Sequence, residues 1–155
     1  MPALQQAQEL KDFAEEMFEL SKEIWAAQTR AKGRSHAEIS ETEFVTLDIL
    51  AKAEKTLTVG DIQRKIGVLP AQMSRIIRSL ENKAEKPLIA CKINASDKRK
   101  VDVELTPAGR QAYQSYRQTK LGATEKLLAA LSEEDRTELM RLLRLIRDFT
   151  HKSLT

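Results

Sequence analysis

The sequence predicts a mainly helical fold with a small β-ribbon, and three observations support this prediction. Apolar residues recur at helical spacing near both ends of the chain, and two short helix patterns surround a tight turn in its middle. Residues 97–109 then read as a cationic turn, a short alternating strand and a helix start. This order is typical of a winged helix-turn-helix module. We expect that module at 40–110, with dimerisation helices at 1–39 and 111–155, in a single compact domain overall.

The composition sets limits on the class of protein. A chain of 155 residues is long enough to bury a core, and its single cysteine excludes an internal disulfide framework. It has no apolar run near the ~18 residues of a membrane span. The N-terminus lacks the basic and apolar regions of a secretory signal. These features favour a cytoplasmic protein with no membrane partner.

The first helix is predicted over residues 3–31. Its apolar seam repeats at intervals of three and four residues: Leu10, Phe13, Met17, Leu20, Ile24 and Ala27. The seam and its flanking apolar residues make a stripe wider than one packing partner requires. A second copy of the chain is therefore expected to cover part of it.

Capping patterns mark the next two helices. Ser40 and Glu43 have capping-box spacing and predict a helix that reaches Ala53. Thr58 and Asp61 repeat this spacing for a shorter helix. The buried face of the first of these helices is predicted to consist of Phe44, Leu47, Ile49 and Leu50.

A fourth helix is predicted from Pro70 to about Lys83, after Gly67 has ended the third. Its inward residues are Met73, Ile76, Ile77 and Leu80. Its outward side is small and polar at the start, so its backbone can approach the floor of a DNA groove. Gln72 suits an adenine edge, and Arg75 suits guanine or a phosphate. The candidate DNA contacts of this recognition helix are Ala71, Gln72, Ser74, Arg75 and Arg78.

A two-stranded β-ribbon follows, with strands at 88–93 and 101–105. In the second strand, alternation places Val101, Val103 and Leu105 on one face and Asp102 and Glu104 on the other. The candidate DNA contacts of the turn are Asp97, Lys98, Arg99 and Lys100. Arg99 suits a narrow minor groove because a guanidinium is weakly hydrated, and we expect Asp97 to hold it in place.

Two further helices complete the chain. Thr106 and Pro107 begin the first, which is predicted to reach Leu131, and Ser132 with Asp135 begins the second. The last helix has a second apolar stripe at helical spacing: Leu139, Leu142, Leu143, Ile146 and Phe149.

Positive charge is concentrated in the middle of the chain. Residues 58–100 hold ten Lys and Arg against four Asp and Glu, whereas residues 1–39 hold five against seven. A basic segment that coincides with a helix-turn-helix pattern indicates a polyanion, and here double-stranded DNA.

These motifs resemble those of the MarR family of bacterial transcription regulators. The wing motif is carried by Asp97, Arg99, Val103, Leu105, Thr106 and Gly109. The recognition-helix motif is carried by Ser74, Arg75, Ile77, Leu80 and Glu81. The resemblance implies an obligate homodimer joined through its terminal helices, a near-palindromic operator, and insertion of Arg99 into the minor groove. The chain departs from the family pattern at Leu69, where a Ser or Thr is usual, and in the longer link at 83–89.

The resemblance also implies small aromatic or lipophilic effectors near the junction of the first two helices. The candidate effector pocket is Phe18, Trp25, Arg30 and His36, and the alternative is that these residues belong to the dimer core. Cys91 is expected to pack as a small hydrophobe, with a redox switch as the alternative. His36 and His151 form no metal-ligand motif, and no cofactor is expected.

The predicted function is a sequence-specific, DNA-binding transcriptional regulator, acting as a repressor. The alternative is a winged-helix protein-interaction module with only nonspecific DNA affinity. An enzyme is not expected, because the sequence has no nucleophile–base pair, phosphate-binding glycine loop or carboxylate constellation.

Overall fold

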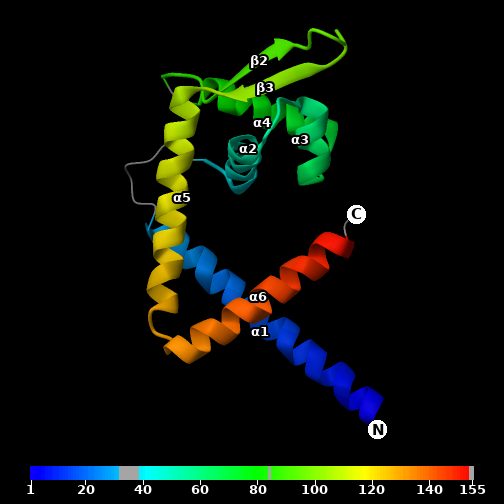
Figure 1. The fold of residues 1–155 in the computed structure, drawn as a ribbon, viewed down its shortest axis with the longest axis vertical. Coiled ribbons are helices and arrows are strands. Elements are labelled where there is room, and N and C mark those ends of the chain that lie inside the picture. The colour runs from blue at the N-terminus through cyan, green and yellow to red at the C-terminus, as the bar shows by residue number, and fades with distance from the viewer. Residues whose placement is uncertain (32–38, 84, 154–155) are drawn as a thin grey trace. The chain divides into compact units, whose positions relative to one another are not determined.

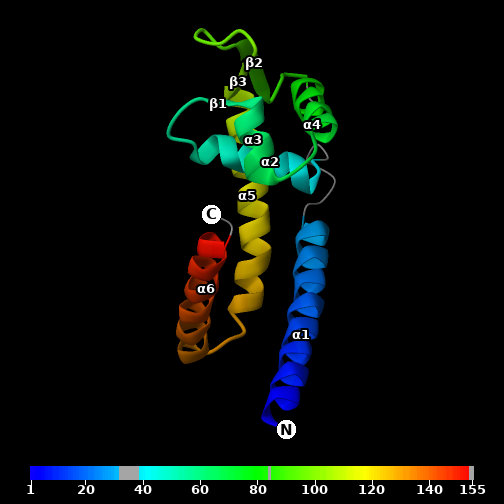
Figure 2. The same cartoon turned by 90° about the vertical axis from the view of Figure 1, so that its right-hand side faces the viewer.

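The computed structural model describes residues 1–31, 39–83 and 85–153, and the chain divides into two compact units. The helical unit combines Met1–Ala31 with Lys120–Thr155, and the winged-helix unit is Lys32–Thr119. Figures 1 and 2 show the elements of both units. The predicted fold class is confirmed: the chain is mainly helical, with a small β-wing and long terminal helices.

The helical unit consists of α1 (Pro2–Ala31), the last turns of α5 (Pro107–Leu128) and α6 (Glu133–Ser153). Within it, the Gln28 amide Nε2 lies 3.5 Å from the Thr124 hydroxyl and links α1 to α5. Most of its apolar side chains face solvent. In the α1 seam, Leu10, Phe13, Met17 and Leu20 keep between 53% and 61% of their surface exposed. No helix in the described part of the chain is both long and apolar enough to cross a membrane.

The predicted caps form in the winged-helix unit. α2 (Glu41–Lys52) and α3 (Val59–Ile66) each begin with a complete capping box, through Ser40 with Glu43 and Thr58 with Asp61. Gly67 ends α3 in the left-handed conformation with φ 82°, which a residue without Cβ adopts at no steric cost.

The predicted two-stranded ribbon forms, and a short third strand that was not predicted extends it to a three-stranded sheet. β1 (Leu57–Thr58) pairs with β3 (Val101–Leu105), which pairs on its other side with β2 (Ile89–Ile93). All pairs are antiparallel, with Thr58 opposite Asp102 and Cys91 opposite Val103. The third strand was missed because two residues are too few to show alternation.

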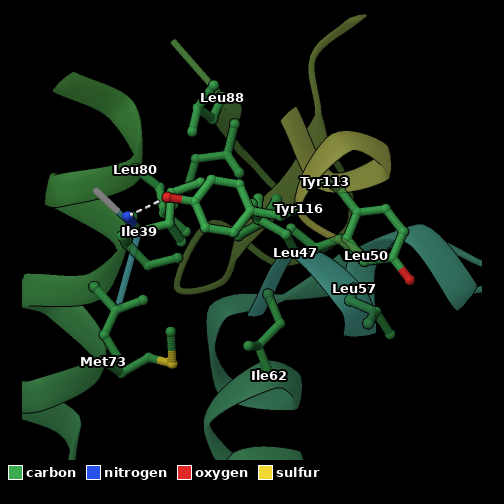
Figure 3. Packing of buried hydrophobic residues seen from close by; sticks show 14 residues of the cluster. Ile39, Leu47, Leu50, Leu57, Ile62, Met73, Leu80, Leu88, Tyr113 and Tyr116 are labelled. Atoms are coloured by element: carbon green, nitrogen blue, oxygen red, sulfur yellow. Dashed lines mark hydrogen bonds between the residues drawn. The ribbon is translucent and has the colours of Figure 1, made fainter. Parts of the chain in front are cut away.

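The core of the winged-helix unit lies between its helices and the sheet (Figure 3). The predicted inward residues of α4 (Pro70–Asn82) are all buried: Met73, Ile76, Ile77 and Leu80. The ring of Phe44 stacks on that of Tyr113 at 5.6 Å between centroids, and the Tyr116 hydroxyl accepts a 3.0 Å hydrogen bond from the backbone N–H of Ile39. The first turns of α5 are thereby fixed to α2.

Two expectations of burial need correction. On α2, Leu47 and Leu50 are buried as predicted, but Phe44 and Ile49 are only half-buried, and the polar Glu43 and Thr46 are buried instead. On β3, Asp102 was predicted to lie on the outward face but is only 8% exposed.

Gly109 marks a close approach between α5 and the strand start. A Cβ added there would lie 1.8 Å from the carbonyl oxygen of Leu88. Thr106 supports the same junction, because its hydroxyl donates to the Pro87 carbonyl at 2.6 Å and accepts from the Gly109 N–H at 3.0 Å. Thr106 is therefore the cap of α5, as predicted, and α5 ends at Leu128 rather than at Leu131.

Candidate nucleic-acid interface

The recognition helix α4 presents its predicted contact residues to solvent. All five are exposed: Ala71, Gln72, Ser74, Arg75 and Arg78. Neither Arg75 nor Arg78 forms an ion pair with any of the described residues. Their guanidinium groups are therefore available to neutralise phosphates or to donate to base edges.

The wing arginine is held by its neighbour. The Arg99 Nε and Nη2 atoms donate to the two carboxylate oxygens of Asp97 at 3.1 and 3.2 Å, and the Arg99 backbone N–H donates to the same side chain at 3.0 Å. These bonds hold the pKa of the Asp97 carboxyl below its ordinary value. The predicted brace between these two residues is confirmed. The Arg99 side chain nevertheless remains 90% exposed, so it is oriented without being buried.

A second brace explains the buried Asp102. The Asn94 amide Nδ2 donates to the Asp102 carboxylate at 2.8 Å. The Asn94 amide oxygen accepts from the backbone N–H groups of Ser96 and Asp97, both at 2.9 Å. Asn94 thus fixes the first half of the wing turn to β3, the central strand of the sheet. No periodicity signals this pair, because its partners are eight positions apart, with Asn94 in the turn after β2 and Asp102 on β3.

A cleft brings the recognition helix and the wing together. It has a volume of about 640 Å³. α3 contributes its first turn and Arg64, α4 contributes Ser74 and Arg78, and the wing contributes Arg99 and Lys100. Arg64 was not among the predicted contacts. Only some of the predicted contacts from the helix and the wing therefore line one concave surface: Ser74, Arg78, Arg99 and Lys100. With Arg64, the cleft has four cationic side chains against the single carboxylate of Glu81, and the rest of its lining is apolar or neutral.

A buried carboxylate joins α2 to the end of α4. Glu43 accepts hydrogen bonds from the Lys83 ammonium at 2.7 Å and the Ser79 hydroxyl at 3.2 Å, besides closing the α2 cap with Ser40. Burial alone would raise the pKa of Glu43, but these bonds outweigh it and hold the pKa below its ordinary value. The sequence identified Glu43 only as a cap residue, although it also fixes the recognition helix.

Cys91 lies half-buried on β2 and packs against the core. Burial, together with the negative charge of Glu81, raises the pKa of its thiol above the ordinary value. A raised pKa disfavours the thiolate, which is the reactive form. These observations favour the structural interpretation of Cys91 over the redox switch.

The candidate effector residues are less well defined. Phe18 and Trp25 are 62% and 61% exposed on α1, and Arg30 is exposed in its last turn. The ammonium of Lys22 lies 4.9 Å from the centre of the Phe18 ring. His36 lies outside the described residues, and the pocket remains a prediction.

An exposed recognition helix beside a braced cationic wing defines the class of winged-helix DNA-binding proteins. Residues 39–101 match the model of the MarR family, and the resemblance predicted from the motifs is confirmed. These residues therefore form a MarR-family module. The HTH-type transcriptional regulator YdgJ of Bacillus subtilis strain 168 is 27% identical over 110 residues, which cover 71% of this chain and 65% of that protein. The match thus spans just under two thirds of that relative.

Solved structures share the fold. FabT of Streptococcus pneumoniae, solved in complex with DNA, superposes with a TM-score of 0.71 at 21% identity, over 94% of this chain and 97% of that one. BpsR of Bordetella bronchiseptica, whose DNA binding is regulated by 6-hydroxynicotinic acid, gives a TM-score of 0.67 at 21% identity, over 87% and 92%.

Proposed function

We propose that the protein is a sequence-specific, double-stranded DNA-binding transcriptional regulator of the MarR type, acting as a homodimer on a near-palindromic operator. The observation that carries this proposal is the cleft that is lined both by Arg78 of α4 and by the braced Arg99 of the wing. A groove-reading helix and a minor-groove arginine on one surface suit duplex DNA, since a duplex offers both grooves side by side. The DNA complex of the similar FabT supports this assignment.

Dimerisation is supported by the exposed apolar side chains of the helical unit. Beside the α1 seam, α6 exposes Leu142, Leu143, Ile146 and Phe149 by 39–73%. Contiguous apolar surface on this scale is rarely left to solvent, and an obligate pair commonly buries more than ~2,000 Å². A two-fold dimer places its recognition helices in successive major grooves, so the half-sites are expected about 10 base pairs apart. A dimer on such a site blocks access to that DNA, and repression follows.

Selection from random duplex DNA at two salt concentrations tests the function. We expect one recovered sequence with two-fold symmetry, and a steep loss of affinity with salt, with a slope of about −0.9 per neutralised phosphate on logarithmic axes. Recovery of no preferred sequence would favour the alternative of an interaction module with nonspecific DNA affinity. A single asymmetric half-site bound with full affinity would contradict the dimeric operator.

Substitution of Gln72 and Arg75 then assigns their roles. If they read base edges, alanine at either position relaxes specificity at one base pair per half-site, at a cost of about 1–3 kcal/mol. A uniform loss across all sequences would assign them to phosphate instead.

A small aromatic acid is the proposed effector, bound near Phe18, Trp25 and Arg30 of α1. Regulation of BpsR by 6-hydroxynicotinic acid supports this class of ligand. Trp25 is the sole tryptophan of the chain, so its fluorescence reports binding directly. Titration with 6-hydroxynicotinic acid should change that fluorescence and weaken operator binding, whereas Arg30→Gln should reduce both effects.

A further inference from the structure

Leu69 is an unusual residue on the surface of the winged-helix unit. Among the described residues of that unit, only Leu69 and Ile93 are large apolar side chains that lie mostly in solvent, at 74% and 66% exposure. Leu69 lies at the start of α4, and Ile93 lies at the end of β2. Single exposed apolar side chains are common on protein surfaces, so the significance of Leu69 depends on its position in the fold.

The local backbone makes Leu69 more unusual. It occupies the N-cap of α4 in extended conformation, with φ −73° and ψ 153°, and offers no side-chain hydrogen bond to the helix. The other helices of the described chain that follow α1 all begin with a hydroxyl that accepts from the third residue, at 3.0–3.2 Å: Ser40, Thr58, Thr106 and Ser132. The recognition helix therefore lacks a stabilising cap that the rest of the chain uses consistently.

The residues after Leu69 extend the same character. Pro70 and Ala71 are also exposed, and the first turn of α4 contains no acidic residue. Leu69, Pro70 and Ala71 are thus apolar and uncharged, while Gln72 follows in the same turn and Arg75 in the next. In helix-turn-helix proteins the N-terminal residues of the recognition helix contact the base edges. The apolar group that the major groove offers there is the C5-methyl group of thymine.

We infer that Leu69 is a specificity-determining residue that contacts a thymine methyl group in each operator half-site. This inference rests on the proposed function and adds to it a base preference read by apolar contact. A phosphate contact would gain nothing from leucine, and a serine or threonine at this position would serve phosphate and helix together. The lost cap is explained if the leucine side chain contributes to binding instead of to folding.

The test replaces thymine by uracil, which removes only the methyl group. Starting from the duplex recovered by selection, each thymine is replaced in turn, and binding is measured for the parent, Leu69→Ser and Leu69→Ala. We expect the parent to lose about fourfold in affinity at one thymine per half-site, the effect of one buried methyl group. Leu69→Ser should bind both duplexes equally, and Leu69→Ala should retain a smaller preference. Cytosine placed at the same position should bind weakly, and 5-methylcytosine should recover part of the loss.

Two controls separate reading from folding. Leu69→Ser supplies the missing cap, so its thermal midpoint should equal or exceed that of the parent. Ile93→Ser removes the other exposed apolar side chain of the unit and should keep the parent's preference for thymine over uracil.

Equal binding of thymine and uracil duplexes by the parent, or an unchanged ratio in Leu69→Ser, would overturn the inference and leave the regulator function intact. Failure to select any sequence would overturn the function itself, and the inference with it.

Discussion

The two units of the molecule treat their apolar side chains in opposite ways. The winged-helix unit encloses Leu47, Ile62, Met73 and Leu80 almost completely, whereas the helical unit leaves most of its large apolar residues exposed. The winged-helix unit therefore has a complete hydrophobic core, whereas the helical unit has an apolar surface that its own residues do not cover. The winged-helix unit has its core within one chain, and the contrast supports the proposal that a second copy covers the helical unit.

The largest expected effect comes from placing a charged residue among the exposed apolar side chains of the helical unit. Leu20→Glu should weaken dimerisation by about 2–4 kcal/mol, because it places an unpaired charge in the proposed interface. Sedimentation over a range of concentrations measures the change. Gln8→Glu, on the opposite side of α1, adds the same charge and should leave the dimer intact. If the parent chain were already monomeric at micromolar concentration, the proposal that a second copy covers the helical unit would be wrong.

The next largest effect is expected in the winged-helix unit, from the loss of a buried carboxylate. Glu43→Ala should lower the free energy of unfolding by about 2–3 kcal/mol, below the value for a fully buried pair because 23% of the Lys83 side chain is exposed. Urea denaturation of the parent and the variant measures this difference, and Glu54→Ala, at an exposed position, is the matched control.

The same substitution should alter the dependence of stability on pH. The folded pKa of Glu43 lies below its unfolded value near 4.5, so its stabilisation is complete above that pH and is lost as pH falls through the folded pKa. The difference in free energy of unfolding between the parent and Glu43→Ala should therefore become smaller at acidic pH. If this difference stayed constant below pH 4.5, the charge of the Glu43 carboxylate would contribute nothing to stability.

Substitution of Arg99, on the surface of the winged-helix unit, should have a smaller effect that is confined to DNA binding. Arg99→Lys preserves charge but loses the two-pronged contact with Asp97, and should weaken operator binding by about tenfold. Lys98→Ala and Lys100→Ala should cost less, and Asp97→Ala should partly copy Arg99→Lys. Affinities for operator and random duplex at one salt concentration provide the comparison. Equal losses for the three basic residues would reduce the wing to nonspecific charge.

Cys91 should show the smallest effect. Its half-buried thiol has a raised pKa, so peroxide should leave the operator affinity of both the parent and Cys91→Ser unchanged. Release of the parent from DNA by peroxide, without release of the variant, would instead make Cys91 a sensor.

The features that could be predicted from the sequence are those encoded by neighbouring residues. The caps of α2 and α3, the inward face of α4 and the brace between Asp97 and Arg99 each depend on residues within about one or two turns of each other. The features that were missed join distant parts of the chain. Glu43 meets Lys83 across 40 positions, and β1 exists only because β3 lies beside it. Such contacts depend on the tertiary arrangement, which no local pattern contains.

Thr58 has a consequence for how the wing transmits force. It is the last residue of β1, paired with Asp102 of the wing strand, and its hydroxyl is also the cap of α3. No linker separates the sheet from the helix at this point, so a displacement of the wing acts directly on the start of the helix-turn-helix. The wing strand and α3 are joined through this one residue. In the proposed DNA complex, a minor groove that does not fit Arg99 would therefore disturb the helices that we propose to contact the major groove, and mismatches in the two grooves would weaken binding jointly.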